Sequence, residues 1–251
     1  MPRAGKAPLT SGFHKQTMTF AGAVLAQLPI LSGGRGQYYI DHQDRLNKVL
    51  RDAFEKDMPK TVKTMPDLLA SAELYMMLFG KAPDFSGLAV PEVPNDGEYL
   101  TIVVDQELAG SKEVLFQARK KLFPTWKYTD DSLDVAIPAE KDERSPRKGT
   151  YVIRVRDSKS PDTELLNKSA NDITSMNIKT MTDTEYALFS AMYFLKHGEH
   201  PDKNTWTLCS GSRCADGDVP GGRWRDDESC VRWCSPSDCR PLLGSRRVIT
   251  L

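Results

Sequence analysis

The chain has 251 residues, enough for one large domain or two modest domains with a substantial hydrophobic core. Its 34 Lys and Arg residues balance its 34 Asp and Glu residues, so net charge gives no attraction to nucleic acid or to an anionic membrane. The apolar segment 20–31 is too short to span a membrane, contains Pro29 and matches a secretory signal poorly. We therefore expect no membrane span and no export through this segment.

The N-terminal region, 1–80, is predicted to be mainly helical. Apolar residues recur with the spacing of one helix face between about 41 and 57. A second helix is framed by Pro66 near its first turn and by Gly80 just past its end. Prolines and glycines then cluster between 81 and 97, which we interpret as a linker to a second domain that covers 98–251.

The first part of the second domain is predicted to mix strands and helices. The β-branched run YLTIVVD, 99–105, is typical of a buried strand, and Ser111 is placed to cap a helix that Pro124 ends. Apolar and polar residues alternate in 133–137 and again in 151–155, which predicts two half-buried strands. Between them, the charged segment 139–149 is predicted to be a solvent-exposed loop. The segment 160–177 is predicted to be a loop with a short helix.

The best-marked helix begins after Thr182. Thr182 and Glu185 have the spacing of a capping box, and the apolar run that follows predicts burial over a wide face. Gly198 is placed to end this helix. The resulting order of strand, helix, strands and helix, followed by several strands, favours an α+β fold.

The tail, 206–251, uses a different set of amino acids from the rest of the chain. It contains all five cysteines, and after Lys203 there is no Lys, Gln or Met. Asp216-Gly217 and the run 220–222 are predicted to be turns, and 243–251 a closing strand. Because side chains alternate along a strand, we expect Trp224, Val231 and Trp233 on a buried face, with their neighbours on the opposite face. Those neighbours are Arg223, Arg225, Cys230, Arg232 and Cys234.

The tail resembles the variable region of proteins that are diversified by diversity-generating retroelements. In that family an error-prone reverse transcriptase randomises template adenines, and the product is displayed on a C-type-lectin-like fold. Almost every residue type of the tail can be encoded by codons that end in a pyrimidine, as randomised AAY codons require. The frame that carries the resemblance comprises Gly211 to Arg213, Asp216 to Pro220, Trp224, Val231, Trp233, Pro236 and Leu243 to Ile249.

The resemblance implies a C-terminal C-type-lectin-like domain, 98–251, with a hypervariable tail at about 209–247. It also implies that the tail residues fall into two classes, a fixed scaffold and exchangeable ligand-binding positions. The scaffold residues would be Arg213, Asp216, Trp224, Trp233 and Arg246. The ligand-binding positions would be Cys214, Ala215, Gly221, Gly222, Arg223, Arg225, Cys230, Arg232, Cys234, Ser235, Ser237, Cys239, Arg240 and Gly244.

The tail cysteines also admit a metal-binding interpretation. Structural zinc sites prefer pairs with the spacing C-x2-4-C, and the gaps between the five cysteines only approach it. The alternative function is therefore a zinc-stabilised, Cys-rich module that binds nucleic acid through the tail arginines. It ranks second because six acidic residues in the tail offset the seven arginines. An odd number of cysteines also argues against a disulfide framework.

The sequence contains no recognisable set of catalytic residues. Ser210 and Ser212 lack the flanking glycines of a nucleophile elbow. The acidic residues between 216 and 228 alternate with Gly and Arg, as they do in solvated loops. The segment Trp224-Arg225-Asp226 differs from the Trp-Asn-Asp motif of calcium-dependent, sugar-binding lectins. This difference argues against inferring sugar binding for this chain from the fold. No catalytic residue, metal or cofactor is predicted.

The sequence thus predicts a receptor-like, ligand-binding protein rather than an enzyme. Its ligand would be set by exchangeable side chains on a fixed backbone, since most surface substitutions change stability by roughly half a kcal/mol. A protein is the favoured ligand, and no nucleic acid is expected. The cytoplasm or a virion is the expected location.

Overall fold

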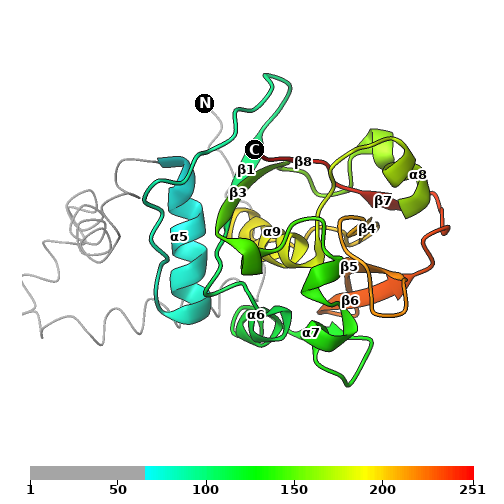
Figure 1. Cartoon of the computed structure of the whole chain (residues 1–251), viewed down its shortest axis with the longest axis horizontal. Helices are drawn as coiled ribbons and strands as arrows, with labels where there is room; N and C mark the ends of the chain where they lie inside the picture. Colours follow the sequence, from blue (N-terminus) through cyan, green and yellow to red (C-terminus); the bar gives the residue numbers. More distant parts are fainter. Residues whose placement is uncertain (1–65) are drawn as a thin grey trace, which may run out of the picture. The chain divides into compact units, whose positions relative to one another are not determined.

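The computed structural model describes residues 66–251, and the helix predicted at about 41–57 lies outside them. The described part of the chain has an α+β architecture, with two sheets and a mixed set of helices (Figure 1). The helices are α5 (Pro66–Phe79), α6 (Lys112–Arg119), α7 (Leu133–Ala136), α8 (Ala170–Ser175) and α9 (Asp183–His197), with 3-10 turns at Ala139–Lys141, Pro146–Lys148 and Thr163–Leu165. The strands are β1 (Tyr99–Val104), β2 (Thr125–Lys127), β3 (Tyr151–Arg156), β4 (Trp206–Leu208), β5 (Val219–Arg225), β6 (Glu228–Cys234), β7 (Leu243–Ser245) and β8 (Val248–Ile249).

The smaller sheet has the strand order β1-β3-β8, and both of its pairings are antiparallel. Ile102 of β1 lies opposite Ile153 of β3, and Val155 of β3 lies opposite Val248 of β8. The β-branched composition suits these positions, because branched side chains pack well on a pleated, buried surface. The predicted strands at 99–105 and 151–155 are confirmed. Strands from the two ends of the predicted second domain therefore flank the same central strand.

Helix α9 is the central helix of the described residues, and its predicted ends are confirmed. The Thr182 hydroxyl accepts from the backbone N–H of Glu185, and the Glu185 carboxylate accepts from the backbone N–H of Thr182. Gly198 ends the helix with φ of 67°, a left-handed conformation that costs glycine little. Between these caps, α9 packs against α5, α6, β1 and β5, and so joins the two sheets.

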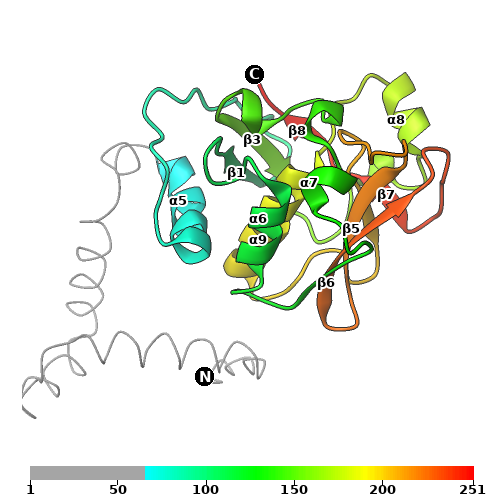
Figure 2. The same ribbon diagram turned by 60° about the horizontal axis from the view of Figure 1, so that its bottom comes forward.

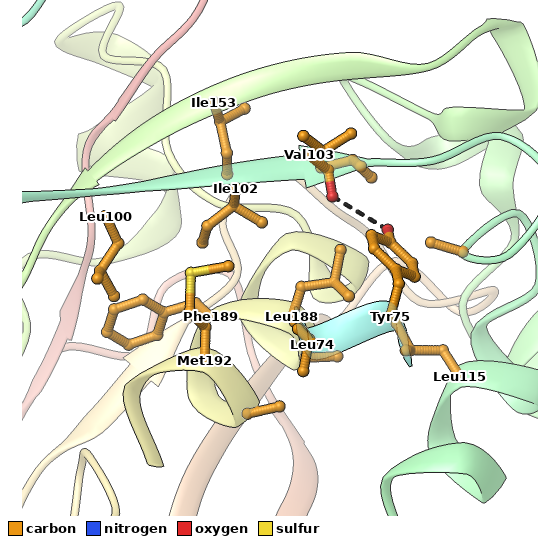
Figure 3. Packing of buried hydrophobic residues seen from close by; sticks show 14 of the residues in the cluster. Leu74, Tyr75, Leu100, Ile102, Val103, Leu115, Ile153, Leu188, Phe189 and Met192 are labelled. Atoms are coloured by element: carbon orange, nitrogen blue, oxygen red, sulfur yellow. Dashed lines mark hydrogen bonds between the residues drawn. The ribbon is translucent and has the colours of Figure 1, made fainter. Parts of the chain in front are cut away.

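The main core lies between α5, α9 and β1 (Figure 3). Leu74 of α5, Ile102 of β1 and Leu188 of α9 are all fully buried, and each such side chain contributes about 1.5 to 3 kcal/mol. The Tyr75 hydroxyl donates to the carbonyl oxygen of Val103 at 3.0 Å and accepts from the N–H of Asp105 at 3.0 Å. The helix predicted between Pro66 and Gly80 therefore exists and shares one core with β1 and α9.

The larger sheet has the strand order β2-β6-β5-β4-β7. Strands β5 and β6 form an antiparallel hairpin (Figure 2), in which Arg225 lies opposite Glu228. The two residues between the strands, Asp226 and Asp227, have φ of 52° and 61°, as a type I′ turn requires. The turn predicted at 220–222 is wrong: these residues lie inside β5.

The strand predicted at 133–137 is wrong, because the segment forms the short helix α7. Ser132 caps it by accepting from the N–H of Asp134, and only Leu133 and Ile137 of the apolar residues are deeply buried. That spacing of four places both side chains on one side of a helical turn, while Val135 is 63% exposed. The alternating pattern was therefore compatible with either structure.

The segment 139–149, predicted to be solvent-exposed, carries buried ion pairs instead. The Asp142 carboxylate lies 2.5 Å from the ammonium nitrogen of Lys112, and neither side chain is more than 4% exposed. Arg144 Nε donates to the Glu185 carboxylate at 2.9 Å. The partners lie on α6 and α9, so these charges are neutralised by residues that are distant in sequence.

The closing strand predicted at 243–251 forms two short strands rather than one. Strand β7 pairs with β4 in the larger sheet, and β8 pairs with β3 in the smaller one. Between them the fully buried Arg246 is held by several hydrogen bonds. The end of the described chain therefore links the two sheets.

Candidate binding face on the tail hairpin

The β5–β6 hairpin presents two chemically different faces. Residues that lie opposite each other on paired antiparallel strands share a face, and successive residues alternate between faces. Gly222 pairs with Val231, and Arg223 pairs with Cys230. We call the face with Gly222, Trp224 and Val231 the inner face, because it packs against the helices. The opposite face, with Arg223, Arg225, Cys230 and Arg232, is the outer face.

Trp224 anchors the inner face by stacking on His200. The two rings lie 3.3 Å apart between centroids and are inclined by only 4°. The other side of His200 stacks on Phe194 at 4.4 Å, and Phe123 approaches the imidazole edge-on. Burial in this aromatic stack lowers the pKa of His200 to about 3, with a smaller effect from Lys203 and Arg119. Nothing in the sequence around His200 indicates its contact with Trp224.

Trp233, predicted to be buried, is 50% exposed. It has the predicted orientation, on the same face as Val231, and its ring meets the Tyr128 ring edge-on at 6.4 Å. The prediction fails because alternation determines the face of a side chain but not how far the covering helices extend. Trp233 lies opposite Pro220, near the end of β6, where cover by the helices is incomplete.

On the outer face, two strands beside the hairpin contribute tryptophans. Trp126 of β2 pairs with Cys230, and the guanidinium carbon of Arg232 lies 5.0 Å from the centroid of the Trp126 ring. Trp206 of β4 has its indole nitrogen against Gly221, which pairs with Arg232. We call this set the arginine–tryptophan face. It consists of Trp126, Trp206, Arg223, Cys230 and Arg232.

The electrostatics of the arginine–tryptophan face are dominated by its cations. Within residues 66–251, neither Arg223 nor Arg232 forms an ion pair with a carboxylate, whereas Arg225 contacts Asp226 at 3.0 Å. Burial raises the pKa of the Cys230 thiol, and Arg232 and Arg223 act in the opposite direction. The thiol therefore remains protonated and neutral beneath two positive charges.

Several positions predicted to bind ligand are buried instead. Cys214, Cys230, Cys234 and the glycines at 221, 222 and 244 have little or no exposed surface. A Cβ atom on Gly222 would lie 1.8 Å from the Tyr186 ring, and one on Gly221 would lie 2.5 Å from the Trp206 indole nitrogen. A Cβ on Gly244 would meet the Leu165 carbonyl oxygen at 3.0 Å. These positions are therefore packed inside the protein and support its backbone, and they offer little or no surface to a ligand.

The structure brings Arg223, Arg225, Cys230 and Arg232 together on the outer face. The remaining candidates lie in loops. Ala215 is exposed in the loop before β5. The loop after β6 contains Ser235, Ser237, Cys239 and Arg240, which are exposed or partly exposed.

The scaffold residues of the tail support its backbone in different ways. Arg213 donates to the carbonyl oxygens of Ser210 and Ser212 at 2.7 and 2.8 Å. The Asp216 carboxylate accepts from the N–H of Asp218 at 3.1 Å and so closes the turn at Gly217. Arg246 is buried in an ion pair with Asp202.

The five cysteines are free thiols and do not converge. Cys209, Cys214 and Cys234 each belong to a different hydrophobic cluster, and Cys239 is exposed. In the part of the chain that the structure describes, no group of three or more His, Cys, Asp or Glu side chains is arranged to hold a metal ion. The cysteine positions therefore give the zinc-module alternative no support.

A small cavity between α6, α9 and β6 is lined by buried charged side chains. Its volume of about 10 Å³ suits roughly one water molecule, and Lys112, Arg119 and Asp183 contribute to its lining. Burial raises the pKa of Asp183 to about 6, and the charge of Lys112 opposes this. A space of this size can hydrate the buried charges but cannot take a substrate.

Comparison with protein-family models, with curated proteins and with solved structures gives no match. None of the helices within 66–251 has the length and apolar character that a membrane crossing requires.

Proposed function

We propose that the protein binds a ligand, with another protein as the favoured class, through the arginine–tryptophan face and the adjoining loop after β6. We further propose that a diversity-generating retroelement varies this surface on a C-type-lectin-like scaffold. The strands β1 and β8 support the scaffold proposal, because both flank β3 and so bring the two ends of the domain into one sheet. A C-type-lectin-like fold typically brings its two ends together in this way.

The observation that carries the proposal is the division of one hairpin into a fixed and an exchangeable side. On the inner face, Trp224 is locked in an aromatic stack and Gly222 lies against Tyr186. On the outer face, Arg223 and Arg232 are partly exposed and form no ion pair within the described residues. Residues of this second kind can change with small effects on stability, whereas those of the first kind cannot.

The proposed set of ligand-binding residues is smaller than the set predicted from the sequence. The buried glycines and the buried Cys214, Cys230 and Cys234 are reassigned from the ligand-binding set to the supporting structure. The proposed contact positions on the hairpin are Arg223, Arg225 and Arg232, with Trp126 beside them. In the loop they are Ser235, Ser237, Cys239 and Arg240.

A pair of matched libraries tests the proposal. One library randomises Arg223, Arg225 and Arg232, and the other randomises Gly222, Trp224 and Arg246. The proposal expects most members of the first library, and few of the second, to display as folded, protease-resistant protein. Equal loss of folded members in both libraries would show that the outer face is structural and would refute an exchangeable binding surface.

The coding DNA tests the diversification itself. The expected finding is a near-copy of the tail's coding sequence that differs mainly at adenines and lies beside a reverse transcriptase gene. Differences spread evenly over all four bases would argue against adenine-specific mutagenesis.

A further inference from the structure

The arginine–tryptophan face has many hydrogen-bond donors and few acceptors. Seven buried side-chain nitrogen or oxygen atoms in the described part of the chain have no hydrogen-bond partner, and three belong to this face. They are Nε of Arg223, Nε of Arg232 and Nε1 of Trp206. Because buried polar atoms are normally paired, this concentration shows that the face is poor in hydrogen-bond acceptors, so the exposed guanidinium donors above these atoms lack oxygen acceptors among the described residues as well.

We propose that this face binds an acidic segment of a partner protein, whose carboxylates engage the guanidinium groups of Arg223 and Arg232. This inference rests on the proposed function and names the chemistry of its ligand. Arginine presents a planar fork of donors that matches the two oxygens of a carboxylate, and such paired hydrogen bonds are among the strongest that side chains form.

Arg232 is positioned in advance for this role. Its guanidinium lies over the face of Trp126, at 5.0 Å from the ring centroid. A cation over an indole ring is attracted to the ring's negative face, which restricts the side chain while leaving the edge donors of the guanidinium available. Trp126 is itself 39% exposed, so it also offers apolar surface for the stem of a Glu side chain.

Arg223 lies diagonally across the hairpin from Arg232. Arg223 pairs with Cys230, whereas Arg232 pairs with Gly221, two residues further along each strand. Diagonal neighbours on one face of a sheet are roughly 7 to 8 Å apart, a separation that neighbouring carboxylates of an acidic segment can match. The Trp206 indole occupies the space above Gly221, where a Cβ atom would lie only 2.5 Å from the indole nitrogen.

The acidic residues around the face favour a peptide over a nucleic acid. Asp226 and Asp227 are exposed at the hairpin turn, Glu228 begins β6, and Asp238 lies in the following loop. A continuous polyanionic backbone that crossed the hairpin would meet these carboxylates, whereas a short acidic segment can contact the two arginines alone. Fixed like charges of this kind select between partners.

The test uses an end-capped, fluorescein-labelled hexaglutamate peptide titrated into the full chain, with anisotropy as the readout. We expect saturable binding that weakens as salt rises, and a loss of at least fivefold in affinity for Arg223→Gln and for Arg232→Gln. Two matched control variants, Arg147→Gln and Arg156→Gln, remove the same charge outside the proposed surface, and their affinity should stay within twofold of the parent. Arg232→Lys keeps the charge but loses the fork, and it should bind with intermediate affinity. Circular dichroism confirms that each variant is folded.

Three outcomes overturn the inference. The first is no saturable binding of hexaglutamate by the parent chain. The second is binding that the two outer-face variants and the two control variants weaken equally, which would reflect net charge alone. The third is binding of a labelled oligothymidylate, lost in the same two outer-face variants, without binding of hexaglutamate. If members of the outer-face library fold but hexaglutamate does not bind, only the proposed ligand class is wrong. If members of that library do not fold, the proposed function itself is refuted.

Discussion

Arg246 and Asp202 form a fully buried ion pair, with Nη2 of Arg246 at 3.0 and 3.1 Å from the two carboxylate oxygens of Asp202. The hydroxyls of Tyr186, Thr205 and Thr207 also donate to this carboxylate. The pair therefore fastens the connection between β7 and β8 to α9 and to β4. A charge this deep is stable only while its partner is present.

Breaking this pair should be among the most destabilising single changes in the described chain. Arg246→Met leaves the Asp202 carboxylate buried without its cation, and we expect a loss of about 3 to 5 kcal/mol in the free energy of unfolding. Urea denaturation measures it. Arg240→Met provides the control, because Arg240 pairs with Asp238 at the surface and should cost less than about 1 kcal/mol. Equal losses for both would contradict the assignment of Arg246 to the scaffold.

The two hairpin tryptophans should differ in their contribution to stability. Trp224→Ala removes the ring that stacks on His200, and we expect a loss of about 3 kcal/mol, at the lower end for large aromatic truncations because Trp224 is partly exposed. Trp233→Ala removes a half-exposed ring, and we expect a loss of about 1 kcal/mol. Thermal denaturation of both variants gives the comparison, and the reverse order would place Trp233 in the core.

His200 should make the protein less stable in mild acid. Its pKa is about 3 in the folded protein and near 6.5 when unperturbed, so between these values the unfolded chain binds a proton that the folded chain does not. Stability is therefore lost as pH falls below about 6.5, at up to about 1.4 kcal/mol per pH unit. Asp183, whose pKa is raised to about 6, acts in the opposite direction between about pH 6 and 4.

Comparison of the parent with the variant His200→Phe isolates the effect of His200 titration on stability, because Asp183 is present in both proteins. We expect the free energy of unfolding of the variant, measured relative to the parent, to rise steadily between pH 7 and pH 5. Urea denaturation at several pH values measures it. A difference that does not change with pH would mean that His200 titrates normally in the folded protein.

The thiols should fall into two reactivity classes. Cys239 is exposed, whereas Cys209, Cys214, Cys230 and Cys234 are buried, and burial raises the pKa of each of these four thiols. Because the thiolate is the reactive form, Ellman's reagent should label one thiol quickly in the native protein and all five after unfolding in urea. Rapid labelling of two or more native thiols would contradict the described burial.

The sequence predicted those parts of the fold that depend on local chemistry. The caps of α9, the strands β1 and β3 and the alternation of side chains along the hairpin follow from neighbouring residues, and the structure confirms them. The sequence missed what depends on distant partners. Nothing near Asp142 indicates that Lys112 neutralises it, and nothing near Trp126 indicates that a three-residue strand sets it beside Arg232. The fit of Gly222 against Tyr186 is likewise a contact between segments.

The two-residue turn at Asp226 and Asp227 constrains how this tail can change its length. Because both turn residues are left-handed and Arg225 pairs with Glu228, the register of the hairpin is set at its tip. Adding or deleting one residue in either strand would shift the pairing by one position and exchange the two faces of that strand. The arginines would then turn toward the helices, and Trp224 would turn toward solvent. Single-residue insertion or deletion in the strands of this hairpin should therefore be more disruptive than replacement of its outer-face residues.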